Sequence, residues 1–176
     1  MTNPKTLTIA ALAALPIAWL HRTNPLLALV AAIAVIAGVM LSEIDLRERR
    51  LPNAITLPLA AGTTIAIPLL ALIHPDTGSL TRSLIVGSAA FALMFLLAVV
   101  AGMGMGDVKY SLSIGLLLGW IGQPYISIAV LVTVLTAALV AVTQAIRNRA
   151  LGGDLALGPF LFLGLWAALF SAGIAS

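Results

Sequence analysis

Apolar residues in this chain run in long continuous stretches and do not alternate with polar ones. The longest stretches without a charged residue or a histidine cover residues 6–20, 23–42, 51–73, 83–106, 110–146 and 155–176. About 20 consecutive apolar residues cross the hydrocarbon core of a bilayer as an α-helix, whereas membrane-spanning strands alternate apolar and polar positions. Backbone hydrogen bonds in lipid are satisfied only by helices and closed barrels. The pattern therefore predicts an all-α, polytopic transmembrane helix bundle.

Seven helices are expected from these stretches. The stretch 110–146 is long enough for two helices, because the residues from Trp120 to Pro124 provide a turn between them. The other stretches hold one helix each, which gives a six-helix core preceded by an N-terminal helix. The predicted helices cover 6–20, 25–42, 54–73, 83–101, 107–121, 125–146 and 156–174. No polar stretch is long enough for a second module, so residues 1–176 are predicted to form one integral-membrane domain.

The first predicted helix has an alternative interpretation as a signal peptide. Lys5 would be its charged region and residues 7–19 its apolar region. The residues that follow, Trp19-Leu20-His21-Arg22, are bulky and basic, unlike a small-residue cleavage site. This favours a retained helix.

Composition excludes several kinds of chemistry. The chain is 61% hydrophobic and only 9% charged, far below the roughly 25% of charged residues in a soluble domain. It contains no cysteine, which excludes disulfides, thiolate catalysis and cysteine-bound metal, and its two histidines are far apart in sequence. Neither a metal nor a cofactor is expected. The net charge of +3 is better explained by membrane topology than by nucleic-acid binding.

The basic residues predict how the chain is oriented in the membrane. If the loop after Asp45 is cytoplasmic, only Arg22 and Arg82 lie outside. The basic residues inside are then Lys5, Arg47, Arg49, Arg50, Lys109, Arg147 and Arg149. This excess of cytoplasmic charge predicts a multi-pass membrane protein with a cytoplasmic N-terminus. It also places Asp45 and Asp107 at the same membrane face.

Asp45 and Asp107 are the strongest candidates for chemistry. Both lie at the edges of membrane-length apolar stretches, in a chain with only six acidic residues. A carboxylate near hydrocarbon is costly to keep ionised, so its presence there is a functional hypothesis by default. Two carboxylates that meet at one site can share a proton, which allows one to act as a base and the other as an acid. The two residues therefore indicate aspartyl acid–base chemistry.

Glycines immediately before Asp107 suggest close backbone approach. Gly104 and Gly106 have no side chain, so either a substrate strand or a neighbouring helix could pack against the aspartate. Packing between helices alone is the competing interpretation. For Gly115 and Gly119, which are spaced four residues apart, we favour helix packing.

Three segments together resemble the type IV prepilin peptidases, a family of membrane aspartyl proteases. The residues Gly104-Met105-Gly106-Asp107 resemble its GxGD signature, and Asp45 followed by Pro52-Asn53 resembles its other conserved segment. The residues Gly158-Pro159-Phe160 resemble a segment of its last helix. The resemblance covers roughly residues 25–170. It implies that Asp45 and Asp107 are the catalytic pair and that no cofactor is needed.

The resemblance also implies the substrate, which would be a prepilin, a pseudopilin or a related precursor. Its leader would be removed at the cytoplasmic edge of its hydrophobic N-terminal segment. Many relatives carry an early loop with paired CxxC motifs that is associated with N-methylation. This chain has neither cysteine nor a large loop, so it resembles a short, peptidase-only form.

Further residues near the two aspartates are candidates for binding or positioning the substrate. Pro52 and Asn53 match the family pattern, although Asn53 could equally cap the next helix. Lys109 could act on Asp107 if it turned inward, but residues two apart on a helix do not share a face, so a topological role is an equal alternative. Glu48, together with Glu43, could receive the basic leader of a prepilin.

Two other functions compete with the peptidase. A proton- or ion-coupled transporter would use Asp107 in a relay, but the sequence has neither an internal repeat nor a charge pair at the middle of a span. A non-catalytic assembly subunit would tolerate loss of either aspartate. The expected partners are the lipid bilayer and a prepilin-like membrane protein, and no nucleic acid.

Overall fold

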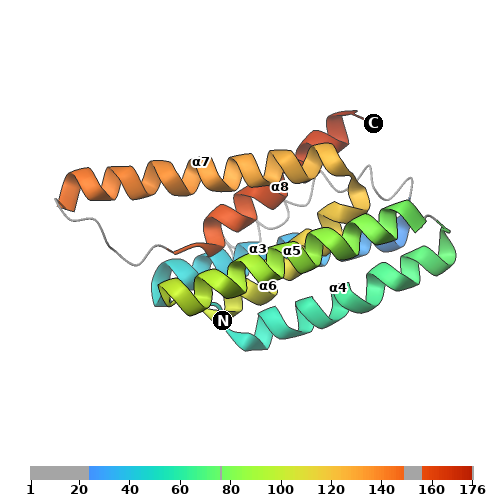
Figure 1. Cartoon of the computed structure of the whole chain (residues 1–176), viewed down its shortest axis with the longest axis horizontal. Helices are drawn as coiled ribbons and strands as arrows, with labels where there is room; N and C mark the ends of the chain where they lie inside the picture. The colour runs from blue at the N-terminus through green and yellow to red at the C-terminus, as the bar shows by residue number, and fades with distance from the viewer. Residues whose placement is uncertain (1–23, 76, 149–155, 176) are drawn as a thin grey trace.

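The structure is a computed structural model that describes residues 24–75, 77–148 and 156–175. These residues form α3 (Pro25–Glu48), α4 (Asn53–Ile73), α5 (Thr77–Ala101), α6 (Met105–Ile121), α7 (Gln123–Asn148) and α8 (Gly158–Ala175). No strand occurs among the described residues, so the predicted all-α helix bundle is confirmed. In Figure 1, α7 and α4 lie at opposite margins of the bundle, and α3, α5, α6 and α8 lie between them. The predicted helix over 6–20 lies outside the described residues.

Two predicted helix boundaries are wrong, because the charged residues next to the apolar stretches do not end these helices. The helix predicted over 25–42 continues to Glu48, so Asp45 lies inside its last turn and not in a loop. Glu43 and Arg47, one turn apart, form an ion pair of 2.5 Å on this extension. The helix predicted over 83–101 begins at Thr77 and therefore contains Arg82.

Four of the described helices are long and apolar enough to cross a membrane. They are Pro25–Glu48, Asn53–Ile73, Gly78–Val100 and Gln123–Ile146. The segment Gly158–Ile174 of α8 is apolar but shorter. Most side chains of α5 and α7 are exposed although these helices are strongly apolar, which is the pattern expected where a helix faces lipid.

Helix α6 is the centre of the bundle. It contacts each of the other five described helices, and most of its residues are buried, including Tyr110 and Leu117. Its closest neighbour is α5. A β-carbon on Gly119 would lie 2.5 Å from the Cα atom of Ser83, and one on Gly115 would lie 2.9 Å from the Cα atom of Gly87. These two glycines are therefore helix-packing residues, because only glycine permits this backbone approach.

Arg82 forms hydrogen bonds with the C-terminal end of α6. Its Nε donates a hydrogen bond to the carbonyl oxygen of Gly119 at 2.6 Å, and its Nη2 donates to that of Trp120 at 3.2 Å. Nη2 also donates to the hydroxyl of Ser79 at 3.1 Å. The last carbonyls of a helix have no partner within the helix and carry partial negative charge, so a guanidinium is well suited to them. A charged residue inside α5 is explained by this contact.

We expect Arg82→Met to destabilise the protein by about 1.5–3 kcal/mol, because hydrogen bonds to a charged group are lost and the α6 carbonyls are left without a donor. Thermal unfolding of the purified protein in detergent, followed by circular dichroism, measures the effect. Arg47→Met is the control: the Arg47 side chain is 68% exposed, and exposed ion pairs contribute about 0–1 kcal/mol. Equal stability changes in the two variants would contradict the capping role.

Candidate active site

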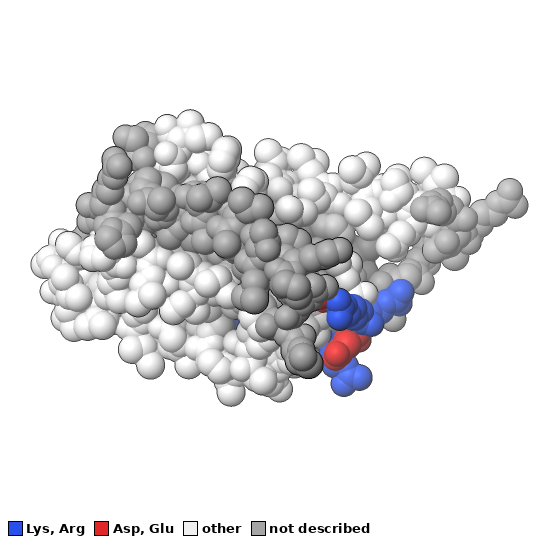
Figure 2. All heavy atoms as spheres, turned by 180° about the vertical axis from the view of Figure 1, so that it is seen from behind, with Lys and Arg blue, Asp and Glu red and all other residues white. Residues whose placement is uncertain are grey.

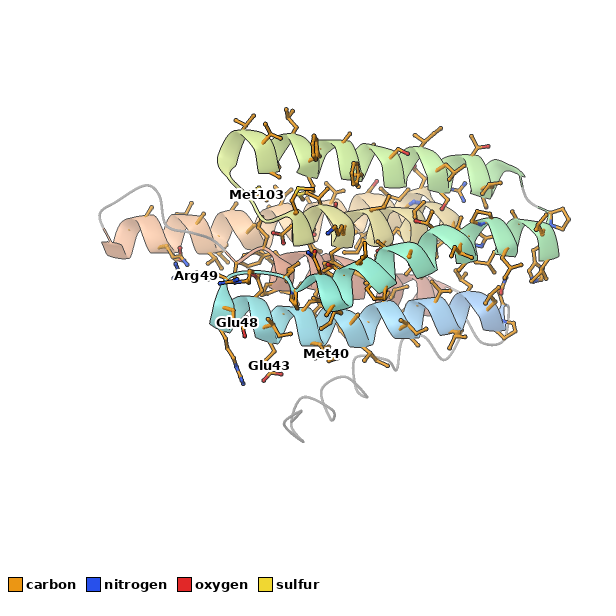
Figure 3. The ribbon with its side chains drawn as sticks, turned by 90° about the horizontal axis from the view of Figure 1, so that it is seen from below. Met40, Glu43, Glu48, Arg49 and Met103 are labelled. Atoms are coloured by element: carbon orange, nitrogen blue, oxygen red, sulfur yellow. The ribbon has the colours of Figure 1, made fainter. Side chains whose placement is uncertain are left out.

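Charged side chains gather at one end of the bundle, where α3 ends and α6 begins. Figure 2 shows Lys, Arg, Asp and Glu side chains together at one end of the face in view, and the rest of the described surface of that face is almost free of charge. Figure 3 shows Glu43, Glu48 and Arg49 at this end, and Met103, in the connection between α5 and α6, at the same end of the bundle. Arg82, by contrast, lies at the other end of α6. The described protein thus has one charged end and an apolar body.

A hydrogen bond from the last helix, α8, positions Asp45 at the charged end of the bundle. It lies in the last turn of α3 and is only 3% exposed. Its Oδ2 accepts a hydrogen bond of 2.8 Å from the backbone N–H of Gly158, the first residue of α8. The N-terminal amides of a helix have no partner within the helix and favour negative charge. The sequence places Gly158 113 positions from Asp45, and the fold brings the two into contact.

Asp107 lies in the first turn of α6 and is 8% exposed. Gly104 is the N-cap of this helix, and its carbonyl oxygen accepts a hydrogen bond of 3.1 Å from the Asp107 N–H. The Oδ1 atom of Asp107 is buried without a hydrogen-bond partner. Gly106, the residue before Asp107, and Gly158, whose N–H binds Asp45, both pack against the same leucine, Leu51, so the two carboxylates belong to one site. Two carboxylates placed in this way can share one proton.

Leu51 packs between the two segments that carry the aspartates. It lies in the connection between α3 and α4 and is buried. A β-carbon on Gly106 would lie 2.5 Å from the Leu51 Cβ, and one on Gly158 would lie 3.2 Å from the Leu51 Cδ2. The same added atom on Gly158 would lie 3.0 Å from the Asp45 Oδ2. Both glycines therefore make room for Leu51 close to the aspartates.

Lys109 turns away from Asp107 and toward α4. Its Nζ donates a hydrogen bond of 2.6 Å to the Oδ1 of Asn53. The Asn53 side chain is thus the hydrogen-bond acceptor of the Lys109 ammonium group. Pro52, in the N-cap position of α4, accepts backbone hydrogen bonds from Ile55 and Thr56 at 3.1 and 3.2 Å. These residues connect the start of α4 to the start of α6.

The remaining predicted site residues lie around the two carboxylates. A β-carbon on Gly104 would lie 3.3 Å from the Oδ2 of Asp107, so the absence of a side chain keeps this carboxylate accessible from the exposed connection. Glu48 is exposed at the end of α3, as Figure 3 shows. Roles for Gly104, Gly106, Pro52, Asn53, Lys109 and Glu48 in substrate binding remain predictions.

Two residues that contact the site were not predicted as part of it. Gly158 belongs to the segment that resembles the family's last helix, and Leu51 is an apolar residue with no chemical group of its own for catalysis. A signal for Gly158 exists in the sequence, because Gly158-Pro159 precedes an apolar stretch and proline favours the first turn of a helix. An amide donor at a helix N-terminus could have been inferred from it. No local signal identifies Leu51, because its role depends on contacts with two distant glycines.

Comparison with known proteins identifies the family. Residues 32–143, which include α3 from its second turn to most of α7, match the model of the type IV leader peptidase family. The match contains both Asp45 and Asp107. No curated protein and no solved structure matches the chain. Because the family model covers more than half of the chain, this protein belongs to the type IV leader peptidase family, and its family membership implies a peptidase.

Proposed function

We propose that this protein is a membrane aspartyl endopeptidase with Asp45 and Asp107 as its catalytic pair. It removes the leader from type IV prepilins, pseudopilins or related precursors. The observation that carries the proposal is the pairing of two buried carboxylates from separate helices, one at the end of α3 and one at the start of α6. The family match supports peptide hydrolysis as the reaction.

The pair can hydrolyse a peptide by general acid–base catalysis. One carboxylate takes a proton from a water molecule, and the water oxygen forms a bond to the scissile carbonyl carbon. The other carboxyl group gives its proton to the carbonyl oxygen. When the tetrahedral intermediate breaks its C–N bond, the first group passes its proton to the leaving nitrogen, and the second group recovers a proton from the intermediate. Protons and electrons balance without a metal or a cofactor.

The placement of charge supports cleavage at the cytoplasmic face of the inner membrane. Arg47, Arg49, Arg50 and Lys109 lie at the same end of the bundle as the two aspartates. Basic residues next to membrane spans are retained in the cytoplasm. A precursor whose apolar N-terminal helix lies in the bilayer presents its leader junction at this depth. The site is therefore suited to a bond at the edge of an apolar helix.

Co-expression with candidate prepilins from the same genome tests the function. We expect a mass decrease equal to the leader, measured on the precursor by mass spectrometry. The new terminus should be unmethylated even when S-adenosylmethionine is added, because the chain has no cysteine-containing loop. Unchanged masses for every prepilin-like precursor of that genome would overturn the proposal.

Cleavage by the purified protein should continue in the presence of a strong chelator. The chain has no cysteine and only two histidines, so it offers few ligands for a catalytic zinc ion. The initial rate with and without chelator measures this, and a zinc-dependent peptidase assayed in the same detergent is the control. Loss of activity that added zinc restores would show a metallopeptidase instead.

A further inference from the structure

The two carboxylates of the site have different hydrogen-bond environments. Asp45 Oδ2 accepts the N–H of Gly158, the first residue of α8, at 2.8 Å. Asp107 Oδ1 is buried and has no partner. Figure 1 shows the beginning of α8 beside the end of α3, so this donor comes from a separate helix. Asp45 is thus supported by an amide of another helix, whereas Asp107 interacts with its own backbone amide and keeps one unpaired oxygen.

This difference decides where a shared proton is more stable. A hydrogen bond from a backbone amide stabilises a carboxylate more than a neutral carboxyl group. A buried oxygen without a donor is costly when it carries negative charge and much less costly as a neutral hydroxyl. The last turn of α3 opposes a charge on Asp45, but the amide end of α8 offsets it. The amide end of α6 also favours a charge on Asp107, but none of its amides donates to the buried Oδ1, so this effect is smaller than the cost of a buried charged oxygen without a donor.

We propose that Asp107 carries the proton of the resting pair and that Asp45, positioned by the first amide of α8, is the base that activates water. Gly158 is then a positioning residue for Asp45. The Asp107 carboxyl group is then the proton donor to the scissile carbonyl, and the α6 amides stabilise the carboxylate that forms when its proton is transferred. The assignment rests on the proposed aspartyl chemistry and adds a separate role for each carboxylate.

Other charged groups near the pair do not favour the opposite assignment. On the end of α3, Glu43 is paired with Arg47, and Glu48 is exposed. Arg49 and Arg50 are exposed in the following connection, and Lys109 on α6 donates to Asn53 on α4. The described part of α8 contains no charged residue, and the only one of α5 is Arg82, at the far end of α6. Solvent screens the exposed groups.

Infrared spectroscopy of the protein in lipid vesicles tests the assignment without any substrate. A protonated carboxyl group has a carbonyl stretching band that a carboxylate lacks. The spectra are recorded at about pH 6, which lies well above the pKa of a free aspartate or glutamate in water. We expect one such band in the parent protein, retained in Asp45→Asn and lost in Asp107→Asn. Circular dichroism of each variant checks that the helices are retained.

The opposite pattern, with the band lost in Asp45→Asn and retained in Asp107→Asn, would overturn the assignment. Loss of the band in both variants, or its absence from the parent protein, would overturn it as well. These spectra do not depend on cleavage. A protein that removed no leader could still show the expected pattern, so failure of the proposed function and failure of this assignment are distinguishable.

Two substitutions of Gly158 test its positioning role, because one keeps the backbone N–H and the other removes it. Gly158→Ala keeps the N–H and adds a β-carbon 3.0 Å from Asp45 Oδ2, whereas Gly158→Pro adds a similar carbon and removes the N–H. We expect the acidic limb of the pH–rate profile to move about one unit higher in Gly158→Pro than in Gly158→Ala, because one hydrogen bond to the ionised base is lost.

Identical acidic limbs in the two glycine variants would overturn the role of the Gly158 amide. If Gly158→Pro does not fold, the infrared titration of Gly158→Ala decides the same point. The retained amide should keep Asp45 ionised, so a single protonated carboxyl band should persist at about pH 6. A second protonated band in this variant would contradict the proposal.

Discussion

Asp45→Asn and Asp107→Asn are each expected to abolish detectable leader removal. An amide can neither take a proton from water nor give one to the scissile carbonyl, and each lost acid or base function lowers the rate by about 10²–10⁴-fold. The two functions act as a unit, so the double variant should be no worse than either single one. Cleavage of a co-expressed prepilin, quantified by mass spectrometry, measures all three.

Folding is not expected to limit these variants. Each substitution replaces a buried carboxyl group near lipid with a neutral amide of the same size, so yield and thermal stability should be equal to or above those of the parent. Asp154→Asn is the matched control, because it makes the same chemical change at an acidic residue that has no role in the proposed mechanism. Activity within a few-fold of the parent is expected for it. Substantial cleavage by either aspartate variant would remove that residue from the catalytic pair.

Gly106→Ala is expected to lower cleavage by about 100-fold, since a displacement of about 1 Å at a catalytic group can have an effect of this size. The added β-carbon would lie 2.5 Å from the Leu51 Cβ and 2.6 Å from the Leu51 carbonyl oxygen. The chain between α3 and α4 or the first turn of α6 must therefore move, and Asp107 is the next residue. Overpacking of this kind also destabilises proteins by about 1–3 kcal/mol.

Two comparisons make the effect of Gly106→Ala specific. Gly62→Ala is the control, because Gly62 lies inside α4 with nothing within 4 Å of an added β-carbon. That change should leave activity intact and stabilise the helix by about 0.5–1 kcal/mol. Adding Leu51→Ala to Gly106→Ala should not restore activity, because the obstructing carbonyl oxygen belongs to the backbone. Parental activity of Gly106→Ala would show that this contact does not position Asp107.

Much of the fold could be predicted from the sequence, because the signals for it are local. Continuous apolar stretches predict helices in lipid, and each described helix consists mainly of residues from one of them. The turn between α6 and α7 was also predictable, because glycine and proline lie close together there. In the structure, Gly122 adopts a φ of 150°. Charge was a poorer guide to helix ends. Asp45 and Arg82 lie inside helices because partners on other helices, Gly158 and the end of α6, satisfy them.

The candidate site also has features that the sequence predicts and features that depend on the fold. The sequence by itself determined that Asp45 and Asp107 are exceptional, since a carboxylate beside an apolar stretch is costly wherever the chain goes. Only the tertiary structure decided which groups surround them. The amide of Gly158 reaches Asp45, and Leu51 fills the space beside Gly106, through contacts between segments far apart in the chain. Hydrogen bonds and packing act over a few ångströms, so the arrangement of the helices decides them, and no local pattern records that arrangement.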